Sequence, residues 1–173
     1  MTASDIQRVL QRLLQERVSI ANLDLILETL VDIGRQEKDP AALCERVRQS
    51  ISASICAGLR GQHAELAVLS LDPRLENRVA AQGAAGHNLI AADPRLAEQL
   101  LTALAPLVDR MLRQGRSPVV LCAGSIRRSL VTLTRRTLPQ LAVISVDEVP
   151  LRMALTSFDV VRLQDADQLE PVA

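Results

Sequence analysis

The chain has 173 residues, of which 48% are hydrophobic and 23% are charged, and its twenty basic residues balance its twenty acidic ones. This length and composition fit one medium-sized globular domain or two small ones. Zero formal net charge argues against the broad positive field on which sequence-independent nucleic-acid binding depends. The single aromatic residue, Phe158, leaves little scope for base stacking or for aromatic cages around cations.

The cysteines and the apolar runs indicate a reducing compartment and no membrane crossing by this stretch. Cys44, Cys56 and Cys122 are odd in number and far apart, which argues against a disulfide framework. No apolar run approaches the roughly 20 residues that span a bilayer, and the N-terminus lacks the pattern of a signal peptide. The sequence also fits a soluble piece of a membrane protein.

Three amphipathic helices are predicted in the first third of the chain. The first begins at Ser4, which we expect to cap it, and carries apolar residues at helical spacing as far as Val18. The second begins near Asn22 and ends at Gly34, a residue suited to a left-handed cap. The third opens at Asp39 and Pro40, with Asp39 as the cap and Pro40 in the first turn, and its apolar stripe continues to Ile55.

Short apolar runs then alternate with helical stretches. Residues 65–71, 118–122 and 141–145 predict buried strands, and a fourth strand is possible at 158–163. Helices are predicted between them, at residues 73–81, 94–113 and 125–138. Strands that alternate with helices indicate crossover connections and a mainly parallel sheet.

The predicted fold is therefore α+β or α/β, with an N-terminal three-helix subdomain followed by a small, mainly parallel β-sheet subdomain with crossover helices. We place the boundary at the glycine-containing stretch near Gly58 and Gly61, which gives subdomains at 1–60 and 61–173.

No pattern for catalysis, cofactor or metal binding stands out. His63 and His87 lie in predicted loops, and the turn from Cys122 to Ser125 lacks the second glycine of a nucleophile elbow. We interpret Cys122 as a buried strand residue and Ser125 as a helix cap. Neither cysteines nor histidines share a ligand spacing. We therefore expect no catalytic residue, no cofactor and no metal.

Charge is distributed in opposite blocks. Arginines cluster on the predicted helices between residues 110 and 136, and acidic residues follow them, among them Asp147, Glu148 and Asp159. These blocks fit a solvated surface, an internal brace or complementary faces of two subunits. A winged-helix-like regulatory or nucleic-acid-binding module is the alternative, but the second helix carries Asp24, Glu28 and Asp32, which would repel phosphate.

Several motifs in the same order resemble the cytoplasmic region of the FlhA/SctV export-gate family of flagellar and virulence type III secretion systems. In the first half these are IQRVLQRLLQERVSI at 6–20 and LILETL at 25–30. In the second half they are LDPRLE at 71–76 and LPQLAVIS at 138–145, followed by DEVP at 147–150. The resemblance covers nearly the whole chain.

This resemblance implies a protein-export function without catalysis. In the family this region lies below the bacterial inner membrane, forms a nonameric ring and receives export substrates and their chaperones. The chain corresponds to the last two subdomains of a four-part cytoplasmic domain, so membrane attachment is expected only through missing N-terminal segments. The family's main chaperone cleft lies between the first two subdomains, which this chain should lack. Expected partners are further copies in a ring, other export-apparatus proteins and chaperone–substrate complexes, and not nucleic acid.

Two sets of charged residues are our candidates for contact surfaces. We expect subunit contacts from residues of the helical part that share exposed faces of alternating charge: Arg8, Arg12, Glu16, Arg17, Glu45 and Arg48. We expect partner docking from arginines of the last predicted crossover helix: Arg127, Arg128, Arg135 and Arg136.

Overall fold

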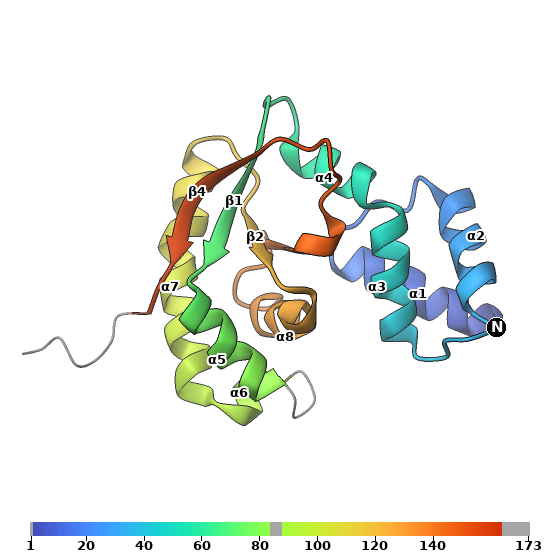
Figure 1. Cartoon of the computed structure of the whole chain (residues 1–173), viewed down its shortest axis with the longest axis horizontal. Coiled ribbons are helices and arrows are strands. Elements are labelled where there is room, and N and C mark those ends of the chain that lie inside the picture. The colour runs from blue at the N-terminus through green and yellow to red at the C-terminus, as the bar shows by residue number, and fades with distance from the viewer. Residues whose placement is uncertain (1, 84–87, 164–173) are drawn as a thin grey trace, which may run out of the picture. The chain divides into compact units, whose positions relative to one another are not determined.

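A computed structural model describes residues 2–83 and 88–163, and the chain divides into two compact units (Figure 1). The first, the helical unit, comprises Met1–Leu66 together with Ser145–Leu155. The second, the α/β unit, comprises Ala67–Ile144 and the chain from Thr156 onward. The helical unit thus includes residues 145–155, which the division by sequence had placed in the range 61–173. No helix within the described residues is long and apolar enough to cross a membrane.

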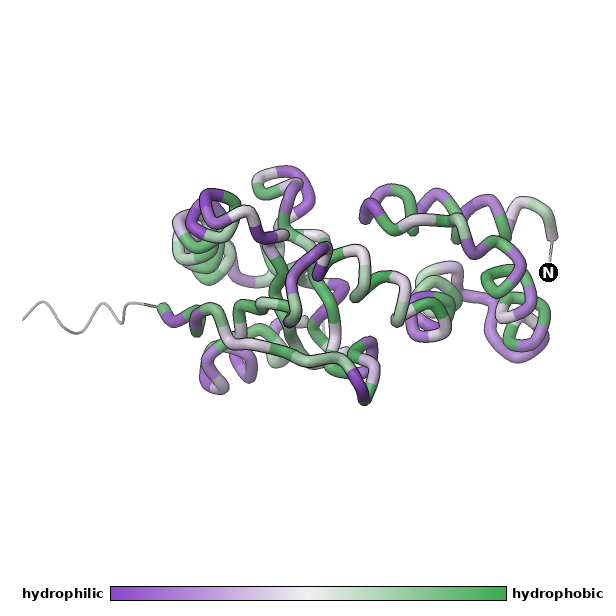
Figure 2. Tube along the Cα trace, turned by 90° about the horizontal axis from the view of Figure 1, so that it is seen from above, coloured by the Kyte–Doolittle hydropathy of each residue, from purple (hydrophilic) through white to green (hydrophobic). Residues whose placement is uncertain are grey.

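The described part of the helical unit contains α1 (Ala3–Gln15), α2 (Leu23–Ile33), α3 (Pro40–Ser50), α4 (Ser52–Arg60) and the short 3-10 helix η1 (Val146–Glu148). Helices α1 and α2 both contact α3. In Figure 2 hydrophobic and hydrophilic residues alternate around the turns of these helices, as expected when only one side is buried. The buried side forms one core: Val9, Leu13, Val18, Ile26, Leu30, Leu43, Cys44, Val47 and Ile51.

Helix caps explain most of these boundaries. Asp39 accepts hydrogen bonds from the N–H groups of Ala41 and Ala42, which confirms the predicted start of α3. The cap of helix α1 lies two residues earlier than predicted, because Thr2 and Asp5 form a reciprocal capping box that replaces the expected Ser4 cap. The hydrogen bond from the Thr2 backbone N–H is the main reason that the pKa of Asp5 is lowered.

The predicted ends of the second and third helices were wrong. Gly34 has φ −67°, so it is not a left-handed cap, and its carbonyl instead accepts a bond from Lys38 Nζ at 2.5 Å. The third predicted helix does not continue to Ile55, because Ile51 leaves the helical conformation (φ −99°, ψ 13°) with its side chain 2% exposed. The chain turns at this buried residue and starts α4, so four α-helices replace the three predicted.

Helices α1 and α7 end in the same way with different residues. After α1, the N–H of Arg17 bonds to the carbonyl of Leu14 and that of Val18 to Leu13, with Arg17 at φ 57°. After α7 (Pro94–Arg113), the residue in this position is Gly115, at φ 68°. Glycine adopts positive φ without steric cost, whereas arginine does not. Arg17 is thus a strained residue at an exposed helix end.

The α/β unit is built on a sheet of β1 (Leu66–Leu71), β2 (Val119–Cys122), β3 (Ala142–Ser145) and β4 (Leu155–Val161), in the order β3-β2-β1-β4 (Figure 1). Strands β1 and β2 run parallel, with Leu69 opposite Val120. The first three strands confirm the prediction, and β4 begins three residues before the predicted range. The mainly parallel sheet with crossover helices is therefore confirmed.

Crossover helices α5 (Pro73–Gly83) and α8 (Gly124–Thr134) accompany α7, and α7 has the predicted bounds. The short helix α6 (Leu89–Ala92) was not predicted. Ser125 was expected to cap α8, but it lies inside the helix and is exposed. The Glu76 side chain of α5 instead accepts a hydrogen bond from the Ala123 N–H at 2.7 Å, at the start of α8. Among the described residues no side chain caps the first turn of α8, and its start is instead held by a residue of a neighbouring helix.

Replacing Val143 with Asp is expected to unfold or severely destabilise the protein. Val143 is 5% exposed in the core of the α/β unit, so the new carboxylate would be buried in an apolar layer. The free energy of unfolding should fall by at least about 3 kcal/mol. Val146→Asp is the matched control, because Val146 is 55% exposed and should tolerate the charge. Urea denaturation of both variants checks this, and equal stabilities would contradict the burial of Val143.

Replacing Arg17 with Gly is expected to stabilise the protein by about 0.5 to 1 kcal/mol, because glycine adopts φ 57° without strain. Gly115→Ala, at φ 68°, is the converse control and should destabilise by a similar amount. Thermal melts of both variants check this. A loss of stability in Arg17→Gly would mean that the arginine side chain contributes more to folding than its conformation costs.

Candidate functional site

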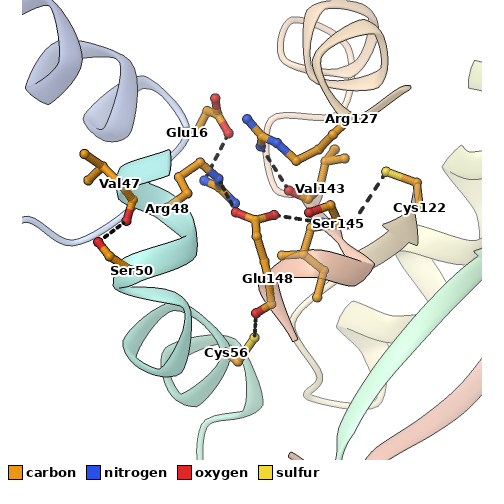
Figure 3. Close-up of polar contacts among 11 residues, drawn as sticks. Glu16, Val47, Arg48, Ser50, Cys56, Cys122, Arg127, Val143, Ser145 and Glu148 are labelled. Carbon is orange, nitrogen blue, oxygen red and sulfur yellow. Dashed lines mark hydrogen bonds and ion pairs between the residues drawn. The ribbon is translucent and has the colours of Figure 1, made fainter. Parts of the chain in front are cut away.

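The polar centre of the helical unit is a buried ion pair between α3 and η1 (Figure 3). Arg48 Nε lies 2.5 Å from Glu148 Oε1, and the two side chains are 2% and 1% exposed. A second nitrogen of the same guanidinium, Nη1, lies 3.1 Å from Oε2 of Glu16, and the Glu16 side chain is 19% exposed. One arginine therefore joins two carboxylates that come from distant parts of the chain.

Glu148 also organises the segment to which it belongs. Its second oxygen accepts the backbone N–H of Ser145 at 2.7 Å, and its carbonyl lies 3.4 Å from the Sγ of Cys56 on α4 (Figure 3). Burial, and secondarily the negative charge of Glu148, raise the pKa of the Cys56 thiol to about 11. Cys56 therefore remains a protonated, unreactive donor at physiological pH. The arrangement is structural: it holds residues 145–155 against α3 and α4.

The candidate subunit-contact residues fall into two groups. Arg8, Arg12 and Arg17 are exposed, as a contact surface requires. Glu45 is partly exposed, and Glu16 is engaged with Arg48. Arg48 itself is buried, so the expectation that it shares an exposed face with the others was wrong. The physical reason is that Glu16 and Glu148 supply the internal partners its charge needs.

The candidate docking arginines divide in the same way. Arg127 is 1% exposed and donates from Nη1 to the carbonyl of Val143 at 3.3 Å, so it cannot present a surface (Figure 3). Arg128 is half-buried. Arg135 and Arg136 are exposed, directly after the last residue of α8. Their positive charge suits the negative end of the helix dipole, and only these two remain fully available to a partner.

Some residues of the two opposite charge blocks form an ion pair within the chain. Arg110 of α7 forms an ion pair with Asp159 of β4, and its guanidinium also lies 4.9 Å from the ring centroid of Phe158. The hydrogen bond from Arg110 is the main reason that the pKa of Asp159 is lowered. Both side chains are at least one-third exposed, so this contact contributes modestly.

The residues considered for catalysis do not form a reactive site in the described structure. Cys122 is buried at the end of β2, with its Sγ 3.6 Å from the Ile144 carbonyl. His63 lies in an exposed turn, and His87 lies outside the described residues. Within residues 2–83 and 88–163 no group of three or more His, Cys, Asp or Glu side chains could hold a metal ion.

One surface feature was missed as a site at the sequence level. The acidic residues of α2 are exposed together with Val31, which is 60% exposed. The signal was present in the sequence, because acidic residues recur at one-turn intervals in residues 24–32.

Comparison with known proteins gives one consistent family. The family model described as "FHIPEP family" matches residues 1–154. The flagellar biosynthesis protein FlhA of Borreliella burgdorferi is 36% identical over 166 residues, covering 95% of this chain and 24% of the relative. FlhA of Bacillus subtilis is 30% identical, covering 93% of this chain and 24% of the relative. The chain thus spans about a quarter of the length of these curated relatives.

Solved structures agree with the sequence matches. The C-terminal domain of InvA has a TM-score of 0.79 at 27% identity, covering 93% of this chain and 50% of that one. The Chlamydia pneumoniae CdsV and CdsO complex also gives 0.79, at 26% identity, covering 94% and 48%. The nonameric EPEC SctV-C gives 0.69 at 27% identity, covering 91% and 51%. These matches confirm the predicted fold and give no support to the winged-helix alternative.

Removing the buried carboxylate is expected to destabilise the helical unit strongly. Glu148→Ala would remove one of the carboxylates that pair with the buried Arg48, which should cost about 3 kcal/mol of unfolding free energy. The double variant Arg48→Met with Glu148→Leu removes both charges and should recover much of that loss. Arg8→Ala, at an exposed arginine, is the surface control and should change stability by less than about 0.5 kcal/mol. Denaturant titrations of the variants would contradict the assignment if Glu148→Ala were no worse than Arg8→Ala.

Proposed function

The chain belongs to the FHIPEP family, and from that premise we propose that it is the C-terminal part of the cytoplasmic region of a type III protein-export gate subunit. The observation that carries the proposal is the family match over residues 1–154, since it includes both units rather than one motif. In this role the chain lies at the cytoplasmic face of the bacterial inner membrane, attached through segments of the longer protein.

The proposed work of the chain is done by surfaces and not by a reactive site. A solved relative is a nonameric ring, which supports head-to-tail association of copies of this chain. For that contact we propose the exposed arginines of the helical unit, Arg8, Arg12 and Arg17, with Glu45 at the margin. Single surface ion pairs contribute only about 0 to 1 kcal/mol, so a ring needs many of them repeated.

The second proposed surface is the arginine pair after α8. Another relative forms a complex of CdsV with CdsO, which supports an export-apparatus protein as a partner of this chain. Chaperone–substrate complexes are further proposed partners. Arg135 and Arg136 are suited to docking, because they are exposed and planar guanidinium groups bind carboxylates through two parallel bonds.

The docking proposal predicts that binding and folding can be separated. Arg135→Glu with Arg136→Glu should weaken binding of the organism's counterpart of CdsO by at least about tenfold, with an unchanged thermal melt. Arg74→Glu, another exposed arginine of the α/β unit, is the control and should bind normally. Surface plasmon resonance with the immobilised partner measures this. Unchanged affinity in the double variant would reject Arg135 and Arg136 as the docking surface.

A further inference from the structure

Helix α2 presents an exposed acidic face with an apolar residue inside it. Asp24, Glu28 and Val31 are spaced by four and three residues, so they share one side of the helix, and Asp32 lies next to them. All four are exposed, and Val31 is 60% exposed. The opposite side, with Ile26 and Leu30, is buried in the core of the helical unit.

This acidic face destabilises the isolated helix. Like charges one turn apart repel, as in the pairs Asp24 with Glu28 and Glu28 with Asp32. Asp32 also lies in the last turn of α2, where the helix dipole is unfavourable for a negative charge and where no basic residue compensates. Within the described residues none of the three acids forms a hydrogen bond or an ion pair through its side chain. A positive partner from outside the chain would remove this repulsion.

Helix α1 carries the complementary charge. Arg8 and Arg12 lie one turn apart on its exposed side, and Arg17 follows at its end. Arg8 makes a loose ion pair with Asp5 at 3.5 Å and a long hydrogen bond from Nε to the Ser4 carbonyl at 3.4 Å. Arg12 and Arg17 have no side-chain partner among the described residues. Arg17 is also the strained residue at φ 57°, and strain kept at an exposed position points to a role in contact.

The two faces belong to helices of one core, but within the described residues they do not pair with each other. Helix α1 packs through Val9 and Leu13, α2 packs through Ile26 and Leu30, and both contact α3. Their exposed sides therefore face outward from this core. A chain with a basic face on one helix and an acidic face on another can bind a second copy of itself head to tail. The basic face of one copy then meets the acidic face of the next.

We propose that the acidic face of α2, formed by Asp24, Glu28, Val31 and Asp32, docks on the basic face of α1, formed by Arg8, Arg12 and Arg17, in the next copy of this chain. The inference rests on the proposed ring function and adds an acidic face on α2, none of whose residues is among the candidates from the sequence. Val31 supplies an apolar contact, and the charges beside it set the register.

Cysteine cross-linking tests this contact directly. Chains carrying Arg12→Cys are mixed with chains carrying Val31→Cys under mild oxidation, and the three natural cysteines are buried and do not interfere. The mixture should give a disulfide-linked pair, and each variant alone should give at least about tenfold less, since each face meets the other and not itself. The control mixture pairs Arg12→Cys with Arg74→Cys, an exposed position on α5. Equal cross-linking in the control, or none in the test mixture, overturns the proposal.

Charge reversal supplies an independent measurement. Arg12→Glu or Glu28→Arg should weaken self-association in sedimentation equilibrium about tenfold, and the mixture of the two variants should recover it, because each supplies the charge the other lacks. Arg17→Gly should weaken association while raising the melting temperature, a combination that loss of folding cannot produce. No recovery in the mixture would count against pairing of α1 with α2.

The outcomes separate this inference from the proposed function. Self-association without cross-linking of residue 12 to residue 31 rejects the face assignment and leaves the ring proposal standing. A chain that stays monomeric at millimolar concentration and gives no cross-link rejects both. Association that stops at a closed dimer also rejects the inference, because a head-to-tail contact adds further copies.

Discussion

The buried pair of Arg48 with Glu148 is the interaction on which the helical unit depends. The two residues lie 100 positions apart, and their contact joins residues 145–155 to a unit otherwise made from the first 66 residues. That segment connects β3 to β4, so the chain passes through the helical unit between the third and the last strand of the sheet. Lysine could not replace Arg48, because the contact uses two nitrogens of one planar guanidinium, Nε and Nη1, to reach two carboxylates.

Much of the fold could be predicted because its signals are local. Asp39 with Pro40 marked the start of α3, and apolar periodicity gave α7 and the first three strands. The failures have different causes. The Ala123 N–H at the start of α8 bonds to Glu76 of α5, a partner far away in the sequence, whereas the Gly34 carbonyl at the end of α2 bonds to the nearby side chain of Lys38. No pattern in the residues around Ser125 could have shown the first of these contacts.

The candidate surfaces were predicted less well, because arginines of the same type serve opposite purposes. Arg127 and Arg128 are neighbours on α8, yet the first is 1% exposed and the second is half-buried. Arg48 follows Val47 on α3, and apolar periodicity assigned it to the outside. Helix α3, however, contacts α1, α2, α4 and η1, so more of its circumference is covered than its apolar stripe indicates. Burial of a charge becomes favourable only when its partners are in place, and those partners are a property of the fold.

The exposed charges of the helical unit explain why a contact between copies can be specific and weak at once. Val31 is the only strongly exposed apolar residue within the acidic face of α2, so little apolar area is available to drive association of separate chains. The rows of charged residues still select one register of the contact, because a shifted register would place like charges together. Under the proposed function the longer protein is attached to a membrane, which raises the local concentration of its cytoplasmic parts without any new contact. Each contact would then have to supply the correct register and not a high affinity, so strong pairing would be unnecessary. The strain at Arg17 would be tolerated for the same reason.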